Sequence, residues 1–191
     1  MPWDEEDLNR QRVQKMIAEA TGGEGVLRID DTGFPQQGKT SVGVERQYAG
    51  TLGKVGNCQI AVTCCDTNAQ ATWPVAVRWY LPQSWAHTPE RRREARVPGE
   101  GPCQTKPEMA LALLDQARAW GVPHRGVVAD ADSGDTPNFL AGLEARQEPD
   151  VVAVRTDFQV SVGGAATTPV WRADELLHSV PRWQWHTMRW R

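Results

Sequence analysis

The sequence predicts an α/β fold built on a mixed β-sheet, in which three antiparallel strands are followed by parallel strands flanked by helices. One observation behind this prediction is that the early β-rich stretches follow one another without a helical pattern between them, as hairpin-connected strands do. The other is that the later β-rich stretches alternate with helical patterns, which is typical of parallel strands. A length of 191 residues, 40% of them hydrophobic, is enough for one domain with its own core.

The first half of the chain supplies a helix and the antiparallel strands. Asp4 can cap a helix over residues 4–20, whose apolar residues recur at helical spacing until Gly22 and Gly23 stop it. The β-branched stretches that follow predict strands, and Pro74 marks one of them as an edge or a bulge. The expected strands cover residues 26–31, 58–65 and 71–82, with a brief pairing at 42–48.

The second half alternates helices with short buried strands. Thr105 and Glu108 have the spacing of a capping box, with Pro107 in the first turn, and Gly121 ends the helix that they begin. The other expected elements are strands at 126–130 and 150–155 and a helix at 136–146, while residues 87–104 form a loop with at most one helical turn. This order is the layout of an RNase H-like core, although other α/β folds share it.

The composition limits the class of protein. The net charge of −3 and the pI near 5.8 argue mildly against a nucleic-acid partner, but the distribution of charge matters more than its sum. No apolar run approaches the ~18 residues that span a bilayer, and the acidic N-terminus is unlike a signal peptide, so we expect a soluble, cytoplasmic protein without a membrane partner. The cysteines lack C-x-x-C spacing and are expected to be free thiols, mostly buried, rather than zinc ligands. They are Cys58, Cys64, Cys65 and Cys103.

Two aspartates stand at the ends of predicted strands. Asp31 ends the first strand, next to Asp30, and Asp130 ends the strand at 126–130. In an RNase H-like sheet these two strands are neighbours, so both carboxylates would meet at one edge of the core. Mg²⁺ takes one or two carboxylates and keeps waters for substrate phosphates, and two such ions about 4 Å apart can support phosphodiester chemistry. The alternative is a pair of strand ends that merely tolerate polar residues.

Two details near these aspartates are left open by the sequence. Because side chains alternate along a strand, only one of Asp30 and Asp31 can point into such a site. The acidic run from Asp130 to Asp135 also suggests a calcium loop, but it lacks the twelve-residue ligand spacing and the terminal Glu of that motif.

Basic and aromatic residues gather in two places. A solvated charged loop is the plain interpretation of the first cluster, which consists of Arg91, Arg92, Arg93 and Arg96. Arginines and tryptophans interleave in the second, which suits stacking on nucleic acid or a surface that contacts protein. The second cluster consists of Trp171, Arg172, Arg182, Trp183, Trp185, Arg189, Trp190 and Arg191.

The motifs around these residues occur together in a known family. They are IDDTGFPQQGKTSVGVERQYAGTLGKVGNCQIAV, WYLPQSWA, RRREARVP, TKPEMALALLDQARAWGVP and GVVADADSGD, in this order. Through them the chain resembles insertion-sequence transposases of the DDE superfamily endonuclease group, from about Pro2 to Arg191. The resemblance implies an RNase H-like catalytic core that binds Mg²⁺, with Mn²⁺ as a substitute, and that cuts and rejoins transposon DNA ends in DNA transposition.

Residues are assigned by their positions in these motifs. The resemblance makes Asp31, before Thr-Gly, and Asp130, which opens DADSGD, the catalytic and metal-binding acids. Lys54 and Lys106 also match family positions, but no role comes with the match. The partners implied are transposon ends and target DNA, with a homodimer as a further option. We expect the arginine cluster to contact DNA phosphates; it consists of Arg91, Arg92, Arg93 and Arg96.

The sequence also departs from the family pattern. The family usually has Asp-Ala-Gly-Tyr-Gly-Asp at residues 130–135, so Asp132 is an extra carboxylate that either adds a metal ligand or disturbs the geometry. Such transposases carry a third acid, a Glu, which we expect downstream of residue 191; the chain would then be a fragment without full strand-transfer activity. The nearest acids outside the expected motif are Glu144, Glu148 and Glu175. The expected domains are an N-terminal helix and linker (1–24), an incomplete catalytic core (25–156) and the start of an insertion or C-terminal segment (157–191).

Three functions remain in competition. The first is a DDE transposase catalytic domain. The second is an inactive or repurposed fragment that binds DNA or protein, favoured by the missing Glu and the changes at residues 132 and 133. The third, an unrelated phosphatase or nuclease, would need a nucleophile or a histidine cluster. The histidines have no ligand spacing; they are His87, His124, His178 and His186.

Overall fold

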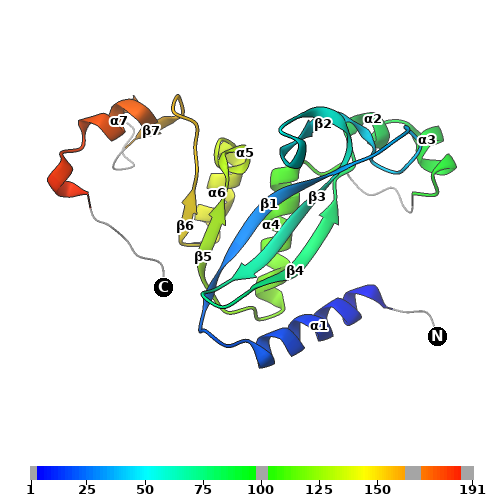
Figure 1. Ribbon diagram of the computed structural model, residues 1–191, viewed down its shortest axis with the longest axis horizontal. Coiled ribbons are helices and arrows are strands. Elements are labelled where there is room, and N and C mark those ends of the chain that lie inside the picture. Colours follow the sequence, from blue (N-terminus) through cyan, green and yellow to red (C-terminus); the bar gives the residue numbers. More distant parts are fainter. Residues whose placement is uncertain (1–3, 98–102, 162–168, 186–191) are drawn as a thin grey trace.

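The computed structural model describes residues 4–97, 103–161 and 169–185 and confirms the mixed α/β fold (Figure 1). The strands of the main sheet are β1 (Gly25–Pro35), β2 (Glu45–Ala49), β3 (Lys54–Thr67), β4 (Thr72–Trp79), β5 (His124–Ala129) and β6 (Asp150–Val152). Their order is β2-β3-β1-β5-β6, with β4 also paired to β3. The early strands pair antiparallel, whereas β5 is parallel to both β1 and β6, as the order of elements predicts.

Helices cover one face of this sheet, and a small hairpin follows it. The helices are α1 (Glu5–Glu19), α2 (Gln83–Ala86), α3 (Pro89–Glu94), α4 (Lys106–Ala119), α5 (Ala131–Gly134), α6 (Pro137–Ala145) and α7 (Ala173–Ser179), with 3-10 turns η1 (Gly50–Leu52) and η2 (Arg182–Gln184). The hairpin pairs β7 (Gln159–Ser161) with β8 (Val170–Arg172) in a separate sheet. The predicted long helices are confirmed, but the sequence did not predict α5, α7 or the hairpin.

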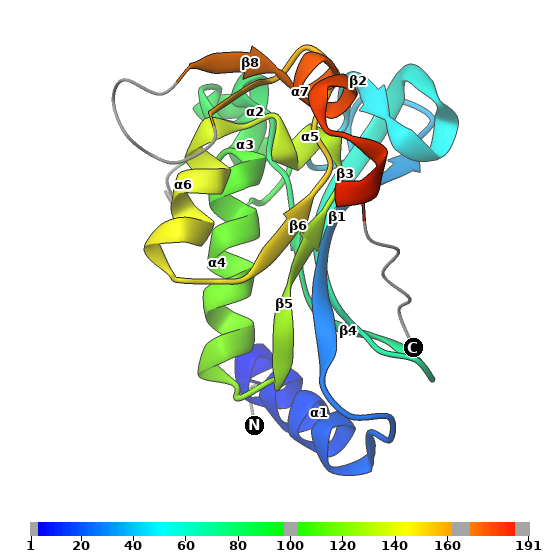
Figure 2. The same cartoon turned by 90° about the vertical axis from the view of Figure 1, so that its left-hand side faces the viewer.

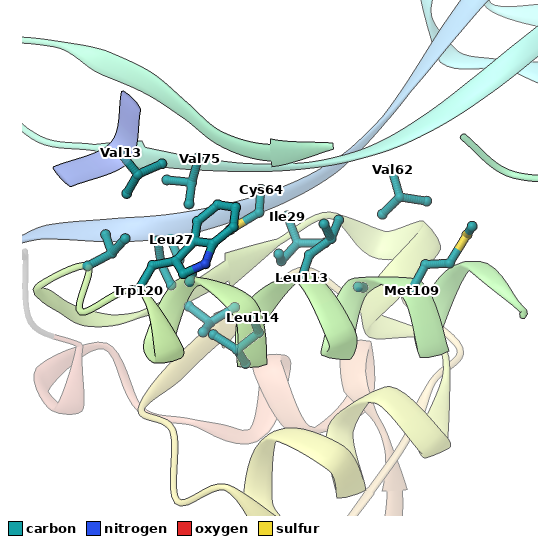
Figure 3. Close-up of a cluster of buried hydrophobic side chains, with 14 of the residues drawn as sticks. Val13, Leu27, Ile29, Val62, Cys64, Val75, Met109, Leu113, Leu114 and Trp120 are labelled. Carbon is teal, nitrogen blue, oxygen red and sulfur yellow. The ribbon is translucent and has the colours of Figure 1, made fainter. Parts of the chain in front are cut away.

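The core lies between the sheet and α4. Leu27 and Ile29 of β1 and Leu113 and Leu114 of α4 are fully buried, and Trp120 after the helix closes one end of the cluster (Figure 3). Figure 2 shows α4 and α6 on the same side of the sheet. Burial of each large apolar side chain stabilises the fold by roughly 1.5–3 kcal/mol, so this interface fixes the position of α4 and of its first turn.

Strand β1 is longer than predicted, and this corrects the expectation that it ends at Asp31. Residues 32–35 continue the antiparallel ladder, from Thr32 opposite Ala61 to Pro35 opposite Cys58. The Thr-Gly-Phe-Pro stretch has weak strand propensity, but pairing with the long strand β3 overrides it. The pairing with β5 stops earlier, so β1 projects beyond its parallel neighbour.

The other local predictions have mixed outcomes. Pro74 lies in the edge strand β4 at a register shift, as expected. Cys58 and Cys64 are buried, and burial raises the pKa of the Cys64 thiol to about 12, so this thiol is unreactive. Cys103, however, is exposed.

Among the described residues no helix has the length and apolar character to cross a membrane.

Candidate functional site

The two aspartates singled out by sequence lie where β1 and β5 separate. The parallel register pairs Ile29 with Ala129, so Asp31 stands two residues past the last pair and Asp130 one residue past it. Strands β1 and β5 are thus the neighbours that an RNase H-like sheet requires. In open α/β sheets ligands bind at the carboxyl ends of parallel strands, which is where both carboxylates lie.

The strand register selects Asp31 over Asp30 as the acid that faces α4. Asp31 is opposite the buried Val62 and shares the core face with Ile29, whereas Asp30 is opposite Thr63 on the other face. An ion pair with Lys106, the first residue of α4, confirms the direction of the Asp31 side chain. Asp30 borders the same cavity from the opposite face of the strand.

A cavity of about 340 Å³ joins these acids. It is lined by Asp30, Asp31, Thr32, Gly33, Tyr48, Ala49, Gly50, Thr51, Ile60, Lys106, Asp130 and Asp132. An adjoining cavity of about 270 Å³ shares Asp31, Lys106 and Asp132 with it. The walls therefore come from β1, from the β2–η1 turn and from the first turns of α4 and α5.

Asp31 is the most desolvated acid of this group. Its side chain is 22% exposed, and the Lys106 Nζ atom lies 2.6 Å from its Oδ2 atom. Burial raises the pKa of the Asp31 carboxyl above its usual value; the hydrogen bond and charge of Lys106 oppose this shift, and the charges of Asp130 and Asp132 add to it. Negative charge is therefore concentrated around a half-buried carboxylate, a setting that favours a bound cation.

Asp130 is held by the short helix that it caps. Its Oδ1 atom accepts a hydrogen bond from the Ser133 amide at 3.3 Å, as an N-cap side chain does. Gly134 lets this helix pack against the chain after β6, because a Cβ atom there would collide with the carbonyl oxygen of Ala153. Asp135 accepts the Arg155 amide at 2.8 Å and pairs with the Arg155 side chain. The DADSGD motif thus fixes the position of Asp130 and leaves Asp132 exposed on the cavity wall.

Gly33 gives the cavity its second wall. A Cβ atom at this position would lie 2.7 Å from the Cβ atom of Ala49, too close for any larger residue. The Thr51 hydroxyl donates a hydrogen bond of 2.6 Å to the Gly33 carbonyl and ties η1 to β1. The Asp-Thr-Gly motif therefore combines an acid with the glycine that lets the β2–η1 turn approach it.

The acids fit a cation that needs few protein ligands. No three His, Cys, Asp or Glu side chains of residues 4–97, 103–161 and 169–185 are arranged to hold a metal ion. Mg²⁺, however, is commonly held by one or two carboxylates, with waters and substrate phosphates completing its shell. The Lys106 ammonium at Asp31 already shows that a cation is accommodated there. Asp31 and Asp130 border one cavity and thus offer the two carboxylates that such a cation takes.

The acids considered as a third ligand do not line this cavity. Glu148 contacts His124 at the opposite end of β5, six residues from Asp130, which is roughly 20 Å of extended chain. Glu175 accepts the Arg172 amide within α7, and Glu144 is exposed on α6. The scattered histidines likewise form no cluster in the described residues.

The arginine cluster is divided by the structure. The Arg91 guanidinium stacks 3.7 Å from the centroid of a Trp85 ring and donates to the carbonyls of Lys39 and Val44, so Arg91 holds α2 and α3 to the loop before β2. The sequence did not predict this structural use. Arg93 forms an exposed pair with Glu90 at 3.5 Å. Contacts with DNA stay a prediction for this cluster, which lies at the same end of the sheet as α5 (Figures 1 and 2).

The arginine- and tryptophan-rich cluster is partly described. Trp171, Trp183 and Trp185 are exposed, Trp183 at 77%, on a segment that lies to one side of the main sheet (Figure 1). Arg172 forms a two-pronged ion pair with Asp174, which occupies its guanidinium. Arg189, Trp190 and Arg191 lie outside the described residues.

Comparisons with known proteins give a family match and a curated relative. Residues 1–176 match the family model of the DDE superfamily endonucleases. The chain is also 30% identical, over 162 residues, to the probable transposase for insertion sequence element IS701 of Microchaete diplosiphon. This alignment covers 84% of the chain but only 40% of that relative, so the chain spans less than half of the relative's length.

Proposed function

Because this chain belongs to the DDE superfamily endonucleases, we propose that the cavity at the ends of β1 and β5 is a transposase catalytic centre that cuts and rejoins transposon DNA. The observation that carries the proposal is that Asp31 and Asp130, ninety-nine residues apart, line one cavity. We propose that residues 25–156 form the catalytic core, preceded by a helix and linker (1–24) and followed by the start of an insertion (157–191). All residues that line the cavity lie within 25–156, and the family match covers this whole range.

DDE superfamily endonucleases are generally dependent on divalent metal ions, and we propose Mg²⁺, with Mn²⁺ as a substitute. When bound, such an ion activates an oxygen nucleophile and stabilises the leaving oxygen of a phosphodiester. Asp31 would supply a half-buried oxygen from the sheet, and Asp130 an exposed one from the cap of α5. Because the Asp130 side chain is restrained by the Ser133 amide, little conformational entropy is lost when it binds a cation.

We propose that Asp31 and Asp130 are two of the three acids that the family resemblance implies. Asp30 and Asp132 also border the cavity, and either could add a further carboxylate oxygen there. We propose that the third acid comes from outside the described residues, since Glu144, Glu148 and Glu175 do not line the cavity. Strand transfer would therefore need more than the residues described, whereas cation binding would not.

Calorimetry of Mn²⁺ binding tests this proposal on the whole chain. We expect Asp31→Asn and Asp130→Asn each to lower the affinity by about tenfold or more, because each removes a charged ligand. The control is Asp157→Asn, which removes the same charge from an exposed position outside the cavity. A nicking assay on supercoiled plasmid follows for the variants that fold, as judged by circular dichroism.

Wild-type affinity in both cavity variants would exclude these aspartates as ligands. If the folded wild type bound no Mn²⁺ at all, the chain would lack a working metal site. The alternative, a catalytically inactive fragment that binds DNA or protein, would then describe it better.

DNA is the partner that the family implies, and we propose that Arg93 and Arg96 contact its phosphates. Replacing both with Gln should reduce the slope of log affinity against log salt by up to about two, since each phosphate contact contributes about 0.9. The control removes two positive charges from α1 at the other end of the sheet, with Arg10→Gln and Lys15→Gln. If both double variants had the same slope of log affinity against log salt, Arg93 and Arg96 would be ordinary surface charges and not phosphate contacts. The expected homodimer stays a prediction.

A further inference from the structure

The ion pair between Lys106 and Asp31 places a cation of the protein's own beside the proposed ligand. The two charged atoms are 2.6 Å apart, and the ammonium also lies 5.8 Å from the centroid of the Tyr80 ring. Lys106 begins α4, where a capping box fixes the backbone: Glu108 accepts the Thr105 amide at 2.7 Å, and Thr105 accepts the Glu108 amide at 3.4 Å. The backbone at Lys106 is therefore rigid, while the four-carbon side chain can change direction.

The ammonium lies where it interferes with a metal ion. Lys106 and Asp31 both border the 340 Å³ cavity and the adjoining 270 Å³ cavity, so their contact lies between the two. A divalent ion binds a carboxylate oxygen at about 2.0–2.6 Å and approaches the same lone pairs that the ammonium uses. Two cations on one oxygen also repel each other strongly in a half-buried setting. A metal ion on Oδ2 of Asp31 thus requires that the ammonium move, and a metal ion on Oδ1 is weakened by its repulsion.

We propose that Lys106 and a divalent cation are alternative partners of Asp31, and that the displaced ammonium turns to a DNA phosphate. This inference rests on the proposed function. In the protein without metal, Lys106 keeps a half-buried carboxylate paired and aimed into the cavity. Once a cation holds Asp31, the ammonium stays at the cavity wall as a positive group beside the substrate. Lys106 is in this role a positioning residue.

Mn²⁺ calorimetry on Lys106→Met tests the competition. Met keeps the length and apolar stem of the side chain but removes the charge, so we expect Mn²⁺ to bind about two- to fivefold more tightly, as loss of a partly exposed ion pair worth up to about 1 kcal/mol implies. Lys106→Arg, which keeps the competing charge, should stay close to wild type. Lys15→Met, which removes an ion-paired lysine from α1, is the matched control and should change nothing. A purely structural role would predict weaker binding in Lys106→Met, the opposite sign.

The destination of the ammonium is tested by the salt dependence of DNA binding. A short duplex is titrated with and without Ca²⁺, which occupies the cavity while cleavage is suppressed. With Ca²⁺, the slope of log affinity against log salt should be smaller in Lys106→Met than in wild type by about 0.9, one phosphate contact. Without Ca²⁺ the two proteins should have the same slope, because Lys106 is held by Asp31. A difference that does not depend on Ca²⁺ would overturn the proposed exchange.

The outcomes separate this inference from the function on which it rests. If wild type binds Mn²⁺ through Asp31 and Lys106→Met binds no more tightly, the competition is excluded while the proposed function stands. If wild type binds no Mn²⁺ but folded Lys106→Met does, the lysine is the barrier and the inference is supported. If neither folded protein binds Mn²⁺, both the inference and the metal-dependent function fail.

Discussion

Acidic side chains gather at both ends of the parallel pair β1 and β5. At the carboxyl ends, Asp31, Asp130 and Asp132 line a cavity, and Asp130 and Asp132 are exposed. At the amino end of β5, Glu148 is 8% exposed and pairs with Arg118 at 3.1 Å and His124 at 3.2 Å. The first group faces space that a ligand can enter, and the second faces fixed partners within the fold.

The balance of charge, rather than the number of acids, distinguishes the proposed binding site from the structural network. Around Asp31, one lysine faces several carboxylates that line the same cavity. Glu148, in contrast, has a cationic partner on one oxygen and a histidine on the other. Asp66 at the same end is 5% exposed and feels the charge of His124, but its Oδ1 atom has no hydrogen-bond partner among the described residues, so this single acid is incompletely compensated. The uncompensated group is the one at the carboxyl ends, where ligands of α/β sheets bind.

The largest expected effect on stability comes from Glu148→Gln. The neutral amide keeps the shape but removes the charge between Arg118 and His124, so we expect a loss of about 2 kcal/mol in the free energy of unfolding. Urea denaturation measures this loss, with the exposed Glu144→Gln of α6 as control. Mn²⁺ affinity should not change. A large loss of Mn²⁺ affinity without loss of stability would reverse the roles assigned to the two ends.

A smaller effect of opposite sign is expected for Asp66→Asn. Burial raises the pKa of the Asp66 carboxyl, the charge of His124 opposes this shift, and the Oδ1 atom has no hydrogen-bond partner among the described residues. The ionised side chain therefore costs stability at neutral pH, and Asn should raise the free energy of unfolding by about 1 kcal/mol there.

The pH dependence of Asp66→Asn sharpens this test. Because the pKa of Asp66 is raised in the folded state, protonation stabilises the native wild type. The advantage of the variant should be absent below the ordinary carboxyl pKa of about 3.9 and should appear as the pH rises through the folded pKa. Urea midpoints over a pH series measure it. A variant less stable than wild type at neutral pH would make Asp66 a paired member of the network, like Glu148.

Local patterns predict much of this fold because they reflect local physics. The capping box at Thr105, the helix over 4–20 and the parallel strands around Asp130 depend on propensity and periodicity, and all are present in the structure. The order of elements also predicts that Asp31 and Asp130 lie close together. These were the parts of the site that a sequence without its structure could locate.

The remaining features depend on contacts between distant segments. The extension of β1 to Pro35 requires pairing with β3, and the stacking of Arg91 on Trp85 joins α3, which was expected as at most one helical turn in a loop, to α2, which was not predicted. The Lys106–Asp31 pair links residues 75 positions apart. Neither spacing nor propensity carries such information, although the resemblance to the family had already singled out Lys106 as a matching position.

Successive side chains of β1 point to opposite faces of the sheet, and this alternation limits the sequence changes that the site tolerates. A slip of one residue in the pairing of β1 would turn Asp30 instead of Asp31 toward α4 and would turn Leu27 and Ile29 out of the core, which the core resists. The choice between two chemically identical neighbours is thus made by aliphatic side chains that never touch a substrate. A one-residue insertion between Ile29 and Asp30 would exchange the faces of the two acids, whereas a two-residue insertion would leave each acid on its original face. The spacing of the apolar residues before Asp31 therefore determines which of the two acids faces α4.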